Sequence, residues 1–161
     1  MDTKPADGLG TQLRRLVQML DGDLEEIYKR DGLAYRPRFT PVMKALSKNS
    51  RQSIKDIAAL SSISHSAASQ TVSRMMADGL VEQDIGTDGR ERLISLTKRG
   101  RSLLPDLKTR WDATQRAADQ LDRELSAPLS GLLAEAIVAL SERPFTERIA
   151  ECEVQVIELT R

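Results

Sequence analysis

The side chains best suited to chemistry in this chain of 161 residues lie between positions 64 and 74, and their chemistry is hydrogen bonding. The helix expected there would present short hydroxyl, methyl and amide groups with two basic side chains on one face: Ser64, His65, Ser66, Ala67, Ser69, Gln70, Ser73 and Arg74. Short side chains let a helix backbone come close to base edges, and a Gln amide suits adenine. A solvated helix face that contacts nothing would have the same composition, so these residues alone leave two interpretations open.

A catalytic function finds little support in the sequence. The single His and the single Cys, His65 and Cys152, are far apart, and no Gly-rich phosphate loop, nucleophile elbow or metal-ligand spacing occurs. A site made only of carboxylates, such as Asp84, Glu91 or Asp106, is an alternative, but no two of these are set together in a cleft-forming pattern. We therefore predict a protein without enzymatic activity, catalytic residues, metal or cofactor.

Two short helices are expected to position the polar face. Ser53, with Asp56 three residues later, has the spacing of an N-terminal cap. A second helix, 65–78, should follow a serine-rich turn and end at Gly79. The apolar face of the first helix would be Ile54, Ile57, Ala58 and Leu60. The apolar face of the second would be Ala68, Val72, Met75 and Met76.

A hairpin is predicted directly after the second helix. Apolar and polar residues alternate over 81–85 and 92–96, and the segment Gly86-Thr87-Asp88-Gly89 between them contains a strong tight-turn signal. Arg90 and Arg92 would project just past that turn. Two short helices followed by such a hairpin are the layout of a winged helix-turn-helix, which places its second helix in the major groove of DNA.

The wing and the helices resemble those of one family. Asp88-Gly89-Arg90, followed by Ile94-Ser95-Leu96-Thr97-Lys98-Arg99-Gly100, is similar to the wing signature of the MarR family of bacterial transcriptional regulators. The family's helix-turn-helix spacing is also kept, in Ile63-Ser64, Val72-Ser73-Arg74 and Asp78-Gly79-Leu80-Val81. The resemblance implies a fold that is mainly α with a small β-hairpin wing, and a regulator, most often a repressor, that binds double-stranded DNA.

Contacts outside the second helix follow from this expectation. Arg90 would enter the adjacent minor groove, where narrow A·T-rich DNA attracts arginine, and Asp88 would hold it. Arg51 and Lys55 would bind phosphates. They belong to a basic run without an acidic residue: Arg36, Arg38, Lys44, Lys48, Arg51 and Lys55. This run fits a phosphate-facing rim, and the alternative is a chance cluster on a solvated loop.

Long amphipathic helices are expected on both sides of this core. We predict a helix whose apolar stripe covers 13–28 and which Gly32 stops, and a helix over 35–47. A long helix capped by Thr97 should run to about Leu125, followed by one from Ser126 onward and one over 145–159. In the resembled family such flanking helices interlock to form a homodimer, and the matching apolar residues here are Leu13, Leu16, Val17, Leu121, Leu125, Leu132, Leu133 and Ile137. A coiled-coil arm is the alternative, which the proline breaks disfavour. A two-fold dimer would set two recognition helices about 34 Å apart on a pseudo-palindromic operator.

Composition and length bound the remaining expectations. Because 40% of the residues are apolar and only 3% are aromatic, the core should be aliphatic and mostly helical. No segment resembles a signal peptide or approaches the roughly 18 apolar residues of a membrane span, and a single Cys is compatible with a reducing cytoplasm. We expect a cytoplasmic protein with a flexible tail (1–10), an N-terminal dimerisation helix (11–34), a winged helix-turn-helix domain (35–100) and C-terminal dimerisation helices (101–161).

Three further hypotheses concern ligands and partners. The resemblance implies a small, commonly aromatic or phenolic effector, and the large side chains available for it are Tyr28, Tyr35, Phe39 and Trp111, each of which also suits a core position. Cys152 falls on an apolar helical stripe typical of inert packing, and redox sensing is its alternative role. A winged-helix module that contacts only proteins, without DNA, is the alternative to regulation.

Overall fold

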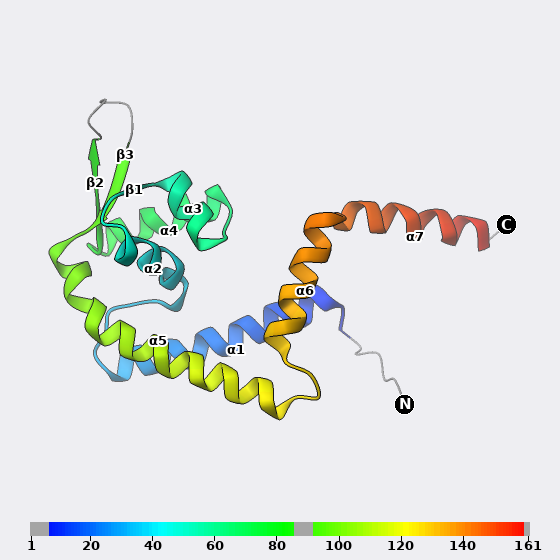
Figure 1. Cartoon of the computed structure of the whole chain (residues 1–161), viewed down its shortest axis with the longest axis horizontal. Coiled ribbons are helices and arrows are strands. Elements are labelled where there is room, and N and C mark those ends of the chain that lie inside the picture. The colour runs from blue at the N-terminus through cyan, green and yellow to red at the C-terminus, as the bar shows by residue number, and fades with distance from the viewer. Residues whose placement is uncertain (1–6, 86–91, 160–161) are drawn as a thin grey trace. The chain divides into compact units, whose positions relative to one another are not determined.

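The structure is a computed structural model that describes residues 7–85 and 92–159 (Figure 1). It is mainly helical with a small three-stranded sheet, which confirms the predicted fold class. The chain divides into two compact units, Met1–Leu107 and Lys108–Arg161. The first unit contains the helix-turn-helix and the wing, and the second contains the C-terminal helices, so each is described separately.

The first helix, α1 (Leu9–Arg30), ends where the sequence predicts. Gly32 adopts a left-handed conformation with φ of 70°, and the N–H of Leu33 returns to the carbonyl oxygen of Tyr28 at 2.8 Å. This hydrogen bond satisfies a carbonyl that has no partner within the helix. Only Tyr28 of α1 is buried, and its apolar stripe, including Leu13 and Val17, is largely exposed.

The segment after α1 differs from the single helix predicted over 35–47. A 3₁₀ turn, η1 (Pro37–Phe39), precedes α2 (Thr40–Lys48). Arg36 is extended, with φ of −122° and ψ of 138°, because a residue before proline is disfavoured in the helical region. Pro41, which has no N–H to donate, lies in the first turn of α2, where none is needed.

The helix-turn-helix has the predicted cap at Ser53 and a second cap at Ser64. In α3 (Ile54–Ser61), the Ser53 hydroxyl accepts a hydrogen bond from the N–H of Asp56 at 3.2 Å. In α4 (His65–Ala77), the Ser64 hydroxyl accepts one from the N–H of Ala67 at 3.1 Å. Gly79 ends α4 with φ of 68°. Each cap satisfies backbone groups that the helix leaves without a partner.

Two apolar residues predicted to face inward on these helices do not. Leu60 of α3 is 57% exposed and Met76 of α4 is 40% exposed, whereas their neighbours Ile57 and Met75 are fully buried. The helical period leaves room for about three to four apolar positions in two turns. Leu60 and Met76 lie at the edge of that stripe, so the prediction is wrong for both.

The sheet contains one more strand than the sequence predicts. β2 (Val81–Ile85) and β3 (Arg92–Leu96) form the expected antiparallel hairpin, with Val81 opposite Leu96. β1 (Gln52–Ser53) pairs antiparallel with the other edge of β3, giving the order β1-β3-β2. A strand of two residues carries no detectable periodicity. The predicted turn, Gly86 to Gly89, lies outside the described residues.

An aliphatic and aromatic core holds the first unit together. Tyr35 packs edge-to-face on Tyr28 and on Phe39, with ring centroids 5.1 and 5.9 Å apart. The remaining fully buried large side chains come from α2, α3, α4, the turn after α4, β3 and α5: Val42, Met43, Ile57, Val72, Met75, Leu80, Ile94 and Leu107. Helix α4 is therefore fixed by its inner face, and its outer face is left for other contacts.

The C-terminal helices are α5 (Lys98–Glu124), α6 (Leu129–Glu142) and α7 (Phe145–Leu159). Thr97 caps α5 as predicted, since its hydroxyl accepts a hydrogen bond from the N–H of Gly100 at 3.0 Å. The next helix starts at Leu129 rather than at Ser126, because Pro128 is its N-cap residue. Ser130 is held by the carboxylate of Asp122, to which both its N–H and its hydroxyl donate.

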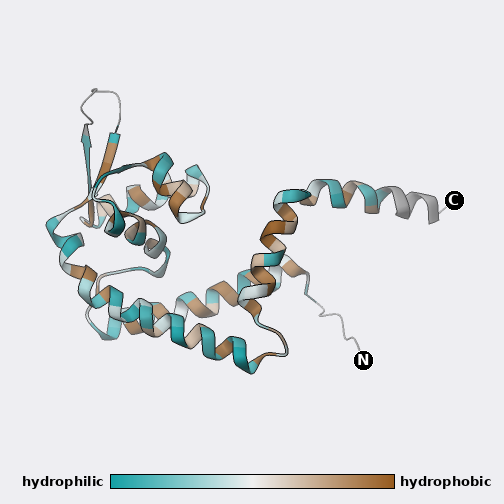
Figure 2. Ribbon diagram, viewed as in Figure 1, coloured by the Kyte–Doolittle hydropathy of each residue, from teal (hydrophilic) through white to brown (hydrophobic). Residues whose placement is uncertain are grey.

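The second unit has no core of its own among its described side chains. Not one side chain from position 108 to 153 is buried. Hydrophobic residues nevertheless line α6 (Figure 2), and the exposed large ones include Leu132, Leu133, Ile137 and Val138. A helix that is apolar on more than one face normally lies between other elements. The described part of this chain does not supply them.

Candidate nucleic-acid interface

The outer face of α4 is polar, as the sequence predicts. His65, Ser66, Ala67, Gln70, Ser73 and Arg74 are exposed, Ser69 is half-buried, and the buried Ala68, Val72 and Met75 lie on the opposite side. Ser64 is also exposed, but its hydroxyl is engaged in capping the helix. The Gln70 amide lies one turn from Ser66 and donates to its hydroxyl at 3.4 Å. The helix thus presents a continuous row of short hydrogen-bonding groups.

Asp78 links the end of α4 to two other segments. One carboxylate oxygen lies 3.8 Å from Nε of Arg74, and the other lies 3.8 Å from Nε of Arg36. Arg99, at the start of α5, donates from Nη1 to the backbone carbonyl of Asp78 at 3.1 Å. Three arginines from different segments therefore converge on the C-cap residue of α4. No local pattern in the sequence indicates this role of Asp78, because Arg36 is 42 positions away.

A second ion pair joins the helix-turn-helix to the wing. Nη2 of Arg51, just before β1, lies 2.8 Å from Oδ2 of Asp84 on β2. Lys55 of α3 and Arg92 of β3 are exposed. The two remaining predicted DNA contacts, Asp88 and Arg90, lie outside the described residues.

The acid-free basic run is partly neutralised by residues outside it. Of its six members, Arg36 faces Asp78 and Arg51 faces Asp84. Arg38 lies over the ring of Phe39, with 5.9 Å between the guanidinium carbon and the ring centroid. The surface around this run is therefore less positive in the folded protein than the sequence of the run suggests.

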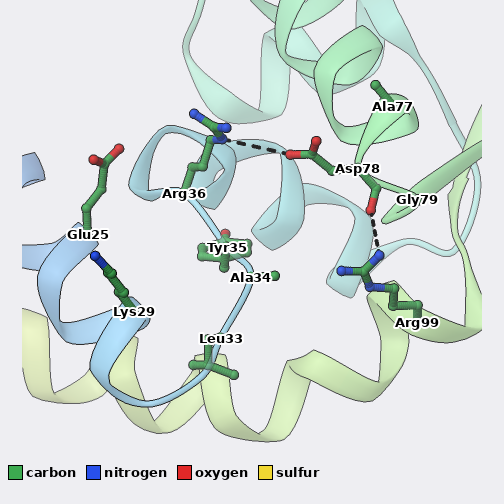
Figure 3. Close-up of a pocket in the computed structure, with 10 residues that line it drawn as sticks. All are labelled: Glu25, Lys29, Leu33, Ala34, Tyr35, Arg36, Ala77, Asp78, Gly79 and Arg99. Carbon is green, nitrogen blue, oxygen red and sulfur yellow. Dashed lines mark hydrogen bonds and ion pairs between the residues drawn. The ribbon is translucent and has the colours of Figure 1, made fainter.

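A hollow of about 660 Å³ lies beside Asp78 (Figure 3). It is lined by Glu25, Lys29, Leu33, Ala34, Tyr35, Arg36, Ala77, Asp78, Gly79 and Arg99. Figure 3 shows Arg36 and Arg99 both reaching Asp78, one to its carboxylate and one to its backbone oxygen. Burial raises the pKa of the Tyr35 hydroxyl well above its usual value, although its hydrogen bond to Thr40 acts in the opposite direction.

The predicted effector residues have different environments. Tyr35 lines the hollow, whereas Tyr28 and Phe39 lie in the core behind it. Trp111 belongs to the second unit and is half-buried. The hollow instead gathers charged side chains that the sequence analysis did not connect with a ligand, namely Glu25, Lys29 and Arg99. Their proximity depends on tertiary packing and leaves no local sequence signal.

Other predicted features can also be located. Cys152 lies on α7 and is exposed, so the described part of this chain does not provide the packing expected for its stripe. Within residues 7–85 and 92–159, no group of three His, Cys, Asp or Glu side chains is placed to hold a metal ion. The described part of the chain contains no single helix that is long and apolar enough to cross a membrane. The helices α5 and α6, joined by a bend of 92°, would be long and apolar enough together, judged by length and composition alone.

The three-stranded sheet, the capped helix pair and the polar outer face of α4 define a winged helix-turn-helix protein. Residues 41–91 match the MarR family model. This match and the structural likenesses below agree with the resemblance seen in the sequence: the chain has the fold of MarR family transcriptional regulators and matches the family model over its central segment. No curated protein matches the chain.

Solved structures agree with this assignment. A MarR family transcriptional regulator from Silicibacter pomeroyi DSS-3 is 26% identical, with a TM-score of 0.60 over 86% of this chain and 99% of that chain. A probable transcriptional regulator from Pseudomonas aeruginosa is 21% identical, with a TM-score of 0.60 over 83% and 97%. BpsR from Bordetella bronchiseptica is 17% identical, with a TM-score of 0.59 over 84% and 99%. The last two likenesses concern the fold alone.

Proposed function

We propose that this protein is a sequence-specific DNA-binding repressor that acts in the cytoplasm as a homodimer and responds to a small molecule. The observation that carries the proposal is the outer face of α4. Its exposed side chains are short, hydrogen-bonding groups on a helix held by a buried inner face. Ser66, Ala67, Ser69, Gln70, Ser73 and Arg74 would meet base edges in the major groove.

Positively charged groups around α4 would hold the duplex. Lys55 and Arg92 are exposed, and such groups bind phosphates and fix the orientation of a protein on DNA without reading its sequence. His65, at the first position of α4, would contact a phosphate or a base. Arg90 is proposed from the sequence to enter the minor groove beside this surface, with Asp88 as its support.

Dimerisation is supported by the apolar surface that the single chain leaves exposed. Leu13, Val17, Leu125, Leu132, Leu133 and Ile137 are all at least 37% exposed, and Leu16 and Leu121 are half-buried. Exposed apolar surface of this kind, present on each unit, marks an interaction site. A second copy of the chain would cover it in a closed two-fold arrangement.

The hollow beside Asp78 is our candidate effector site. It includes the last residues of the recognition helix, Ala77 and Asp78, so a ligand there would contact the end of the element that reads DNA. BpsR, which shares the fold, has its DNA binding regulated by 6-hydroxynicotinic acid. A small aromatic acid is therefore the first class of ligand to test.

Footprinting on the DNA that flanks the protein's own gene tests the proposal. We expect a protected pseudo-palindrome with half-sites about one helical turn (~34 Å) apart, and partial loss of protection when 6-hydroxynicotinic acid is added. An unprotected flank, together with no gel shift on that DNA, would favour a winged-helix module that contacts only proteins. Protection that changes only on thiol oxidation would favour sensing through Cys152.

A further inference from the structure

We infer that Asp84 limits the affinity of this protein for DNA of any sequence, because it neutralises Arg51 in the DNA-free protein. This inference rests on the proposed DNA-binding function and concerns its affinity. We place Asp84 in no contact with DNA. It acts through Arg51 and controls how much positive charge the wing side of the protein offers to phosphates.

The ion pair spans the central strand of the wing sheet. Arg51 immediately precedes Gln52, which lies opposite Ile94 of β3, and Asp84 lies opposite Leu93 on the other side of β3. The guanidinium of Arg51 and the carboxylate of Asp84 meet across this strand at 2.8 Å. Because the sheet order is β1-β3-β2, the two charged residues come from its opposite edges, 33 positions apart in sequence.

The backbone on both sides of the pair is fixed. Gln52 is only 5% exposed, and its amide donates to the carbonyl oxygens of Ala45 at 3.0 Å and Asn49 at 3.4 Å. Asp84 lies within the β2–β3 ladder. The backbone of Arg51 is therefore held in place by the buried neighbour Gln52. Pairing with Asp84 then costs less conformational entropy than a pairing between two mobile loops.

The charges remain accessible to a third partner. The side chains of Arg51 and Asp84 are 60% and 42% exposed, and an ion pair this exposed contributes little to stability. A phosphate that approached Arg51 would have to compete with the carboxylate and would be repelled by it. Sequence-independent binding to DNA scales with the number of phosphates that a protein neutralises. Asp84 therefore removes the contribution of one phosphate contact from that affinity.

Base-specific contacts from α4 do not depend on this pair. Asp84 therefore lowers the affinity for specific and for random-sequence DNA by about the same factor, because a lost phosphate contact weakens both. The carboxylate of Asp78 likewise lies beside Arg36 and Arg74, so it also lowers the positive charge that the protein offers to phosphates. A formal net charge of zero for the whole chain agrees with a regulator that is kept from binding every duplex it meets.

The experiment compares Asp84→Asn with Glu82→Gln on a random-sequence duplex. Glu82 is an exposed carboxylate two residues away on the same strand, and its neutral variant removes the same charge without releasing Arg51. We expect D84N to bind the duplex more tightly than E82Q, with a salt slope steeper by about 0.9. That advantage should shrink about threefold between roughly 50 and 200 mM salt.

An Arg51→Gln background tests whether the effect passes through Arg51. In that background D84N should gain no more than E82Q, and the double variant R51Q/D84N should bind the duplex about as well as the wild type. Circular dichroism and thermal unfolding of each variant would establish that the exposed substitutions leave the fold intact.

The outcomes that contradict the inference are distinct. Equal binding by D84N and E82Q would overturn it, and weaker binding by D84N would show instead that Asp84 orients Arg51 toward a phosphate. An undiminished advantage of D84N in the R51Q background would also overturn it. If the wild type bound no duplex even at low salt, the proposed function itself would fail, and the inference with it.

Discussion

Gly100, in the first turn of α5, lies directly against the backbone carbonyl of Leu80, so that a Cβ atom on Gly100 would overlap the carbonyl oxygen. The same carbonyl accepts a hydrogen bond from the N–H of Thr97 at 3.0 Å, and the Thr97 hydroxyl donates to the carbonyl of Gly79 at 2.7 Å. The end of the recognition helix is thus joined to the start of the long C-terminal helix by contacts that admit no side chain.

Gly100→Ala should therefore destabilise the first unit. Overpacking in a tight site costs about 1–3 kcal/mol, and here the overlapped atom is part of the backbone. Chemical denaturation would measure the loss. Gly22→Ala is the matched control, because nothing lies within 4 Å of its Cβ position in α1, and it should stabilise the protein by about 0.4–1 kcal/mol. A fully stable G100A would contradict the described packing.

Gln70 and Lys55 should affect DNA binding in different ways. Gln70→Ala should weaken binding to the operator by about 1–3 kcal/mol and leave random-sequence binding nearly unchanged, because it removes a base contact. Lys55→Gln should weaken binding to all sequences and flatten the salt slope by about 0.9, because it removes a phosphate contact. Titrations of both duplexes at several salt concentrations would separate these patterns. Equal losses on both duplexes for Q70A would argue against base readout by α4.

Ile137→Asp should convert the proposed dimer into a monomer. Ile137 is 65% exposed on α6, and a carboxylate buried at an interface without a partner is strongly unfavourable. Sedimentation equilibrium would give the molecular mass. Leu60→Asp is the control, since Leu60 is 57% exposed on α3 and belongs to no predicted dimer helix. Retention of the dimer by I137D would exclude α6 from the interface.

The joint between α5 and α6 should depend on pH through Asp122. Hydrogen bonds from the hydroxyl and N–H of Ser130 hold the pKa of the Asp122 carboxyl below its ordinary value of 3.8. A carboxyl whose pKa is lower in the folded state stabilises the fold above its unfolded pKa, and this contribution is lost as the pH falls through the folded pKa.

Asp122→Asn should therefore be less stable than the wild type at neutral pH. The difference should stay constant down to about pH 4 and then shrink toward zero as the solution is acidified further. Denaturant titrations at a series of pH values would follow the difference in unfolding free energy. Asp112→Asn, which changes an exposed carboxylate on the same helix, is the control. A D122N deficit that persisted in strong acid would point to packing rather than to ionisation.

Predictions that depended on neighbouring residues were the successful ones. The caps at Ser53 and Thr97 are correct, because a cap involves a hydroxyl and an N–H three residues later. The left-handed conformations of Gly32 and Gly79 are correct for the same reason. The polar face of α4 also follows from its period alone, since burial of Ala68, Val72 and Met75 leaves the other positions outside.

Features that require distant segments to meet were decided only by tertiary structure. β1 forms because β3 offers a free edge for pairing. Leu60 and Met76 are exposed because no neighbouring element covers their side chains in the described part of the chain. The pairing of Arg51 with Asp84 depends on the sheet register, and no local pattern encodes it. By itself the sequence determined which segments are helical and which face of α4 is polar, because those properties arise within about four residues of chain. The tertiary structure decided which of the charges around that face are neutralised, because ion pairing requires side chains from different strands and helices to come within a few ångströms.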